Sequence, residues 1–193
     1  EYATTVYSNI LKELYPDSAV VIGGIEASMR RFTHYDYWQD RLKKSILIDS
    51  KADILVYGMG EQPMTALVKS MREKLSSTGN GYITAEEAKD ITKNIRQTGY
   101  IEDQKNITID SENDRLLAAH EECLKDKAKL ADNFHAIEKA SNRVNAKRLL
   151  QETEEGVVVI NPPFPTMTTE QLDHSFDLPY TRLPHPKYKG KRI

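Results

Sequence analysis

The sequence has a single cysteine, Cys123, among its 193 residues. One thiol cannot form a disulfide within the chain, and it cannot supply the several thiolates that a cysteine-rich zinc site or an iron–sulfur cluster requires. The five histidines are scattered along the chain, so they form no cluster of metal ligands in the sequence. We therefore expect no metal site here, and we expect Cys123 to be a packed core residue and not a nucleophile.

Long hydrophobic runs and an excess of one charge are also missing. None of the apolar segments approaches the length of about 20 residues that crosses a bilayer, and the sequence carries no recognisable signal peptide. With 27 basic and 29 acidic residues the net charge is −2, which argues against a nucleic-acid partner. These absences predict a cytoplasmic protein with no membrane partner.

An α/β pattern occupies the first 76 residues. Short apolar runs rich in β-branched side chains, at residues 19–22 and 54–57, are typical of parallel strands that are buried on both faces. Apolar residues at helical spacing predict helices over residues 1–15 and 63–76, and residues 26–31 favour another helix. The segment therefore predicts part of a parallel sheet that is packed against helices.

The composition changes near residue 77, where a run of turn-forming residues begins. Capping-box spacing over residues 84–87 and 168–171 predicts two helix starts. Residues 111–140 predict one long amphipathic helix, and residues 98–109 predict two short strands. Residues 148–151 and 157–160 predict a β-hairpin, after which most of the proline-rich range 161–187 should be extended.

These segments suggest three parts: an α/β part at 1–76, a largely helical part at 77–155, and a proline-rich connector at 156–193. The sequence starts with Glu1 inside a predicted helix, so we expect it to be a piece of a longer protein. A sheet that contains only part of its strands should have an unpaired edge.

Two glycine-bearing loops follow the predicted parallel strands. The carboxyl ends of such strands meet at one edge of a sheet, where ligands bind and where glycines allow close approach to the backbone. This placement predicts a cofactor-binding set of Gly23, Gly24, Glu26, Ser28, Gly58, Gly60 and Glu61. The alternative is that the glycines only make tight turns and that Glu61 caps a helix. Neither loop has a nucleotide-binding fingerprint.

A dense polar and aromatic cluster comes between the two loops. Guanidinium groups bind phosphates or carboxylates, aromatic rings stack on planar ligands, and a histidine beside a carboxylate is an acid/base pair. The cluster therefore predicts a substrate-binding or interdomain surface made of Arg30, Arg31, His34, Tyr35, Asp36, Tyr37 and Trp38. The alternative is a structural cap over the edge of the sheet. No catalytic residue is assigned.

In order along the chain, several blocks resemble the YgiQ family of radical SAM proteins. These blocks are residues 20–28, 34–38, 45–61, 161–163, 178–180 and 185–186. Residues 76–155 match little and are similar to the variable insertion of that family. The resemblance implies that residues 1–76 are a partial Rossmann-like domain and that the connector with its Asn-Pro-Pro and His-Pro blocks leads into a radical SAM barrel. More loosely, the two strands with their glycine loops are similar to half of the cobalamin-binding domain that precedes many radical SAM cores.

The resemblance implies a larger enzyme of unknown substrate. In the family, a radical SAM barrel follows, and its CxxxCxxC loop binds a [4Fe-4S] cluster and S-adenosylmethionine (SAM). That motif is absent here, so the resemblance implies that this chain alone binds no cofactor and is inactive. A cobalamin contact would transfer only to Gly23 and Gly24, and the expected partner is the barrel of the same polypeptide.

Two rival functions remain open. One is a docking module without a ligand, in which residues 34–40 are a contact surface between domains. The other is a nucleotide-binding Rossmann enzyme, whose fingerprint is missing from both glycine loops.

Overall fold

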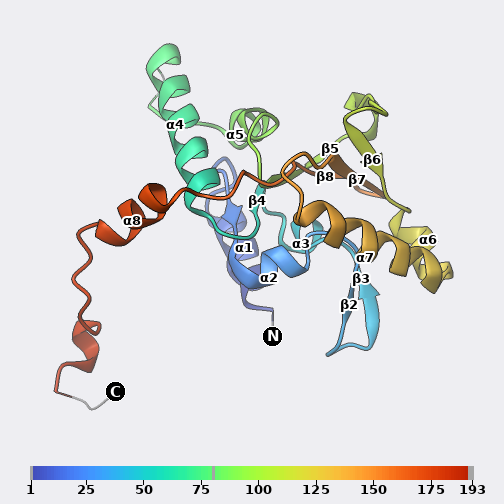
Figure 1. The fold of residues 1–193 in the computed structure, drawn as a ribbon, viewed down its shortest axis with the longest axis horizontal. Helices are drawn as coiled ribbons and strands as arrows, with labels where there is room; N and C mark the ends of the chain where they lie inside the picture. The colour runs from blue at the N-terminus through green and yellow to red at the C-terminus, as the bar shows by residue number, and fades with distance from the viewer. Residues whose placement is uncertain (1, 80, 191–193) are drawn as a thin grey trace.

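The computed structural model describes residues 2–79 and 81–190 (Figure 1). Its α-helices are α1 (Ala3–Leu14), α2 (Gly24–Met29), α3 (Ile46–Ser50), α4 (Glu61–Thr78), α5 (Ala85–Thr92), α6 (His120–Lys125), α7 (Lys127–Ser141) and α8 (Thr169–Asp177). Two 3₁₀-helices are η1 (Gln104–Asn106) and η2 (Pro186–Tyr188). The strands are β1 (Val21–Ile22), β2 (His34–Asp36), β3 (Arg41–Lys43), β4 (Ile54–Val56), β5 (Thr98–Glu102), β6 (Asp114–Leu116), β7 (Arg148–Thr153) and β8 (Gly156–Ile160).

Six strands form one sheet in the order β1-β4-β5-β8-β7-β6. The pairs β1–β4 and β6–β7 are parallel, whereas β5 is antiparallel to both of its neighbours and β7–β8 is an antiparallel hairpin. The predicted α/β class, the parallel pair and the hairpin are therefore confirmed. The part from β1 to β4 is Rossmann-like, because its crossover returns the chain to a parallel neighbour.

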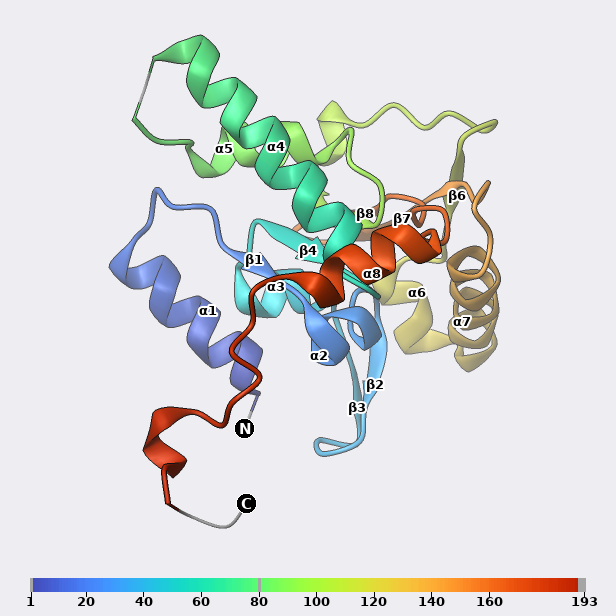
Figure 2. The same cartoon turned by 60° about the vertical axis from the view of Figure 1, so that its left-hand side comes forward.

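Helices cover both faces of this sheet (Figure 2). Successive residues of β4 point to opposite faces: Leu55 packs with residues of α2, α3 and α7, while Ile54 packs with Leu67 of α4 and Ala88 of α5. A third cluster of buried residues lies around Tyr100 and Leu150, on β5 and β7. All three residues of β4 are buried, which explains why its sequence is continuously apolar.

Two of the expected elements differ in the structure. The single helix over residues 111–140 is wrong, because strand β6 and two helices occupy this range. Asp126 has an extended backbone, and its carboxylate accepts a hydrogen bond from the Ala128 amide at 2.8 Å, so it ends α6 and caps α7. The two strands expected over residues 98–109 are one strand, β5, followed by η1.

Both predicted capping boxes are present. Thr84 and Glu87 form one at the start of α5, and Thr168 and Gln171 form the other at the start of α8. The unassigned residues 32–38 enter a small antiparallel hairpin, β2–β3, which pairs His34 with Lys43 and Asp36 with Arg41. In Figure 1 this hairpin projects from the body below α3 and α7.

The sheet crosses both of the proposed domain boundaries. Strand β5 of the central segment pairs with β4 of the first segment and with β8 of the last. The division at residues 77 and 156 stays a prediction, and hydrogen bonds join its three parts into one sheet.

Strand β1 is the outer strand of the described sheet, and among the described strands it pairs only with β4. Helix α1 lies near it, and its apolar residues are largely exposed: Tyr7 is 68% exposed and Leu14 is 65% exposed, whereas Ser8 is buried. None of the described helices combines the length and the apolar character needed to cross a membrane.

Candidate functional site: a cavity at the carboxyl end of the parallel strands

A cavity of about 560 Å³ lies where β4 ends. Its walls come from the end of β4, the segment after α2, the C-terminal part of α7 and the chain that leads into α8. The residues that line it are Ser28, Arg31, Tyr57, Gly58, Met59, Gln62, Gln97, Glu138, Ser141, Pro163, Phe164, Pro165, Thr166, Met167 and Leu172. Cavities of this size at strand ends hold small molecules in many α/β proteins.

Ser28 joins the two predicted glycine loops. Its hydroxyl donates to the carbonyl of Gly24 at 2.7 Å and accepts the amide proton of Gly58 at 3.0 Å. Gly58 has φ of +67°, a conformation that favours glycine. The structure thus brings the loops after β1 and β4 to one edge of the sheet, and Ser28 and Gly58 both line the cavity.

Gln97 holds the rim of the cavity, and the sequence patterns did not identify it. Its side-chain nitrogen donates to the carbonyls of Tyr57 (2.8 Å) and Met59 (2.6 Å), and its side-chain oxygen accepts from the amide of Phe164 (3.2 Å). One buried amide therefore ties the glycine loop to the connector. A lone glutamine between a helix and a strand carries no periodic or motif signal, so sequence reasoning could not find it.

Asn161, the first residue of the Asn-Pro-Pro block, is buried and forms several hydrogen bonds. Its side-chain nitrogen donates to the carbonyls of Thr92 (3.0 Å) and Ile95 (2.8 Å) and lies 3.1 Å from the hydroxyl of Thr98. The Tyr57 hydroxyl donates to the Asn161 carbonyl at 2.7 Å, and burial raises the pKa of this phenol. These bonds fix the connector, at the residue that follows β8, against the end of β4 and the start of β5.

Arg31 is the charged residue at the inner side of the cavity. Its guanidinium donates to the carbonyl of Ser28 and to the hydroxyl of Ser141, the latter at 2.6 Å, and it stacks 5.0 Å from the centre of the Tyr57 ring. Burial lowers the pKa of Arg31. Of the two predicted arginines only Arg31 lines the cavity, whereas Arg30 forms an ion pair with Glu26.

The other predicted cofactor-binding residues do not line this cavity. Gly23 precedes α2, where a Cβ would lie 3.4 Å from the carbonyl of Val56, and Gly24 has φ of +79°. Glu26 accepts hydrogen bonds from the amide and hydroxyl of Thr4 and forms an ion pair with Arg30 at 3.0 Å. Gly60 and Glu61 begin α4. A cofactor role for these residues stays a prediction.

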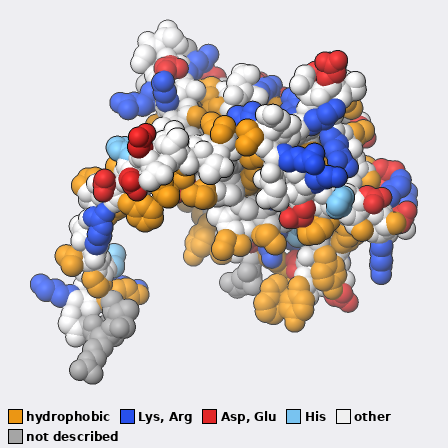
Figure 3. All heavy atoms as spheres, in the orientation of Figure 1, with side chains coloured by type: hydrophobic (Ala, Val, Ile, Leu, Met, Phe, Trp, Pro, Cys, Tyr) orange, Lys and Arg blue, Asp and Glu red, His pale blue; other side chains and the backbone are white. Residues whose placement is uncertain are grey.

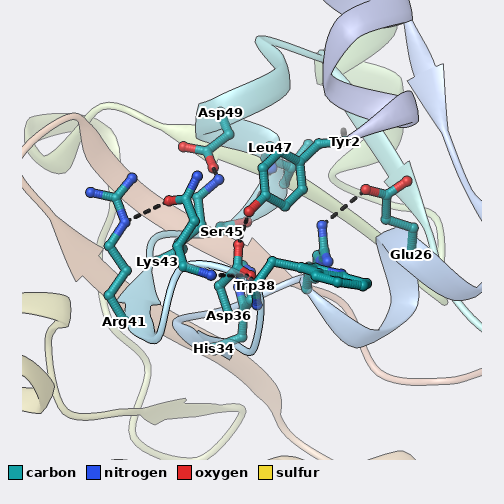
Figure 4. Close-up of polar contacts among 12 residues, drawn as sticks. Tyr2, Glu26, His34, Asp36, Trp38, Arg41, Lys43, Ser45, Leu47 and Asp49 are labelled. Carbon is teal, nitrogen blue, oxygen red and sulfur yellow. Dashed lines mark hydrogen bonds and ion pairs between the residues drawn. The ribbon is translucent and has the colours of Figure 1, made fainter.

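The hairpin residues form a separate group, shown in Figure 4. Asp36 is buried, and it accepts hydrogen bonds from the hydroxyl of Tyr2 at 2.5 Å and from the amides of Trp38 (2.9 Å) and Gln39 (3.4 Å). These bonds, with that from Tyr2 foremost, hold the pKa of Asp36 below its usual value. Asp36 therefore anchors the hairpin turn to the residue that precedes α1.

His34 does not form the acid/base pair considered from the sequence. Its Nδ1 lies 3.0 Å from the carbonyl of Phe32, and among the described residues it makes no hydrogen bond with Asp36 or Asp40. Asp40 instead accepts a hydrogen bond from the hydroxyl of Tyr35 at 2.5 Å. Burial is the main cause that lowers the pKa of His34, so the ring favours its neutral form.

The aromatic side chains at the tip of the hairpin are exposed. Tyr37 and Trp38 are 76% and 80% exposed, and their rings meet edge to face with centres 5.5 Å apart. Figure 3 shows hydrophobic side chains gathered at this projecting tip, below the body of the protein. An exposed aromatic pair of this kind suits contact with another domain or chain better than binding of a small ligand.

Asp36 makes the stability of the chain dependent on pH. Its folded-state pKa lies below the ordinary value of 3.8, so its contribution is complete above that value and is lost as the pH falls through the folded pKa. Acid unfolding followed by circular dichroism should therefore show a smaller loss of stability below about pH 4 in Asp36→Asn than in the original chain. Equal acid sensitivity of the two proteins would contradict this assignment, and Asp177→Asn is the control on an exposed carboxylate.

The residues of this chain do not fit an iron–sulfur cluster. Cys123 is buried, lies 3.2 Å from the side-chain nitrogen of Asn133, and has a thiol pKa raised by burial. Among the described residues, no three His, Cys, Asp or Glu side chains come together as a metal site. A cluster needs several thiolates, which one cysteine cannot supply.

The fold and the cavity define the chain as an α/β module with a ligand-sized site at the ends of its parallel strands. The chain belongs to the Radical SAM N-terminal family, whose model matches residues 1–193. The resemblance to the YgiQ family is confirmed, because the curated relatives are UPF0313 proteins of that family.

Relatives from bacteria and archaea match nearly the whole chain. A UPF0313 protein of Bacteroides thetaiotaomicron is 55% identical over 193 residues, which are 100% of this chain and 31% of that relative. A UPF0313 protein of Porphyromonas gingivalis is 52% identical, covering 100% of this chain and 28% of the relative. One of Methanocella arvoryzae is 38% identical, covering 97% and 29%. The chain thus spans less than a third of these relatives, and no solved structure matches it.

Proposed function

We propose that this chain is an accessory domain of a cytoplasmic radical SAM enzyme and that its strand-end cavity forms part of the roof of the active site. The cavity carries the proposal, because residues of the connector line it, and the connector is the part of the chain that leads toward the radical SAM barrel in the family that the chain resembles. In this proposal the cluster and SAM bind elsewhere in the longer polypeptide. A cobalamin contact at Gly23 and Gly24 stays a prediction.

The reconstituted full-length protein tests this role. After anaerobic treatment with iron and sulfide it should gain a charge-transfer band near roughly 400 nm and cleave SAM when reduced. The 193-residue chain, treated in the same way, should stay colourless and inactive, since it has one cysteine. A cluster band from this chain alone would contradict the proposal.

The exposed aromatic tip favours docking of the hairpin as a second candidate function. Two variants of the full-length protein separate the candidates, because both change exposed side chains: Met59→Trp fills the cavity, and Trp38→Ala trims the tip. A roof over the active site predicts a loss of turnover in Met59→Trp with little change in Trp38→Ala. Docking without a ligand predicts the reverse pattern.

A further inference from the structure

Arg31 is a largely buried cation without a carboxylate partner. Among the described residues it forms no ion pair, whereas its neighbour Arg30 pairs with Glu26 and Arg148 pairs with Asp114 through two hydrogen bonds. The acceptors of Arg31 are a carbonyl and a hydroxyl, which are uncharged. Burial removes much of the hydration of a guanidinium, and the free-energy cost of that loss is only partly offset when no negatively charged partner is present.

A second arginine adds positive charge near the same ring. Arg96 donates to the carbonyls of Pro163, at 2.8 Å, and Val144, so its hydrogen-bond acceptors are also uncharged. Arg31 lies 5.0 Å from the centre of the Tyr57 ring. Burial raises the pKa of this phenol, and the positive charges of Arg31 and Arg96 oppose that rise. Glu138, the acidic residue in the lining, is exposed and interacts with Arg31 only beyond ion-pair distance.

The rest of the wall is mainly apolar. The larger apolar side chains in it are Tyr57 and Met59 from the loop after β4, and Phe164, Met167 and Leu172 from the connector. A site with one charged anchor and an apolar wall selects small molecules that have a charged end and a hydrophobic body.

We propose that the cavity binds a small organic carboxylate, with its charged group against Arg31 and its apolar body against Tyr57 and the connector. This inference rests on the proposed role of the cavity in the enzyme, and it specifies the chemical class of the substrate or ligand. The carboxylate gives Arg31 the ion-pair partner that it lacks among the described residues, and a guanidinium binds a carboxylate through paired N–H donors.

Benzoate is the probe, and benzamide is its uncharged counterpart. In calorimetric titrations of the full-length protein, benzoate should bind at least about tenfold more tightly than benzamide, as expected for a charge-assisted hydrogen bond. Arg31→Met should lose this preference, while Arg31→Lys should keep part of it. Arg41→Met, which removes an exposed arginine of the hairpin, should bind like the original protein.

Several outcomes would overturn the proposal. It is wrong if benzamide binds as well as benzoate, or if folded Arg31→Met keeps the full affinity. It is also wrong if inorganic phosphate binds at Arg31 while benzoate does not, since the apolar wall would then have no part. If Arg31→Met does not fold, the Arg31→Lys titration decides. If benzoate shows no such preference while the same preparation cleaves SAM normally, the assignment of the ligand is wrong and the proposed function is unaffected.

Discussion

Replacing Gly156 with alanine should lower the free energy of unfolding of the chain by about 4 kcal/mol. Gly156 begins β8 with φ of +141°, a conformation that side chains disfavour. A Cβ at this position would lie 2.7 Å from the backbone carbonyl oxygen of Glu102 and 3.1 Å from Ile101. Because the closest atom belongs to the backbone of the neighbouring strand, the clash cannot be relieved by a side-chain rotation.

Urea unfolding followed by circular dichroism measures this effect. The control is Gly81→Ala, since a Cβ on Gly81 meets no described atom within 4 Å. The control should change stability by well under about 1 kcal/mol. Equal stabilities of the two variants would show that β5 and β8 are not held as closely as described.

Asn161→Ala should cost about 3 kcal/mol of stability and should also loosen the cavity. The substitution removes the donor that serves Thr92 and Ile95, and it leaves two carbonyls without this partner in a buried place. It also frees the start of the connector, whose next residues line the cavity. Weaker ligand binding should therefore accompany the lower stability.

The matched control for Asn161 is Asn142→Ala. Asn142 is exposed and its side-chain nitrogen donates to a helix carbonyl, that of Glu138, at 3.0 Å. Water can replace this bond, so the control should lose less than about 1 kcal/mol. If both variants unfold at the same urea concentration, Asn161 does not hold the connector.

The placement of the two glycine loops could be predicted because parallel strands impose it. Once residues 19–22 and 54–57 are strands, their carboxyl ends share an edge, and the bond between Gly58 and Ser28 realises this expectation. The residues of the predicted cluster from Arg30 to Trp38, by contrast, lie in two separate places. The β2–β3 hairpin carries Tyr37 and Trp38 outward, while Arg31 stays at the sheet.

Local sequence patterns also failed to predict which residues of a helix are buried. The apolar stripe of α1 predicts a helix correctly, yet the structure buries Ser8 and exposes Tyr7 and Leu14. Helical spacing predicts that the apolar residues share one face of a helix, but it does not predict whether another element buries that face. Residues 111–140 show a different limit, because the carboxylate of Asp126 caps α7 and interrupts a pattern that the spacing alone presents as one continuous helix.

By itself, the sequence determined the α/β class, the paired strand ends, the capping boxes and the family, because these depend on short-range patterns and ordered blocks of residues. Only the tertiary structure decided which residues share the cavity. Gln97 and Phe164 lie 67 positions apart, and Arg31 and Ser141 lie 110 positions apart, yet each pair is joined by a hydrogen bond. Such contacts arise from the packing of the sheet, its helices and the connector, which no local spacing encodes.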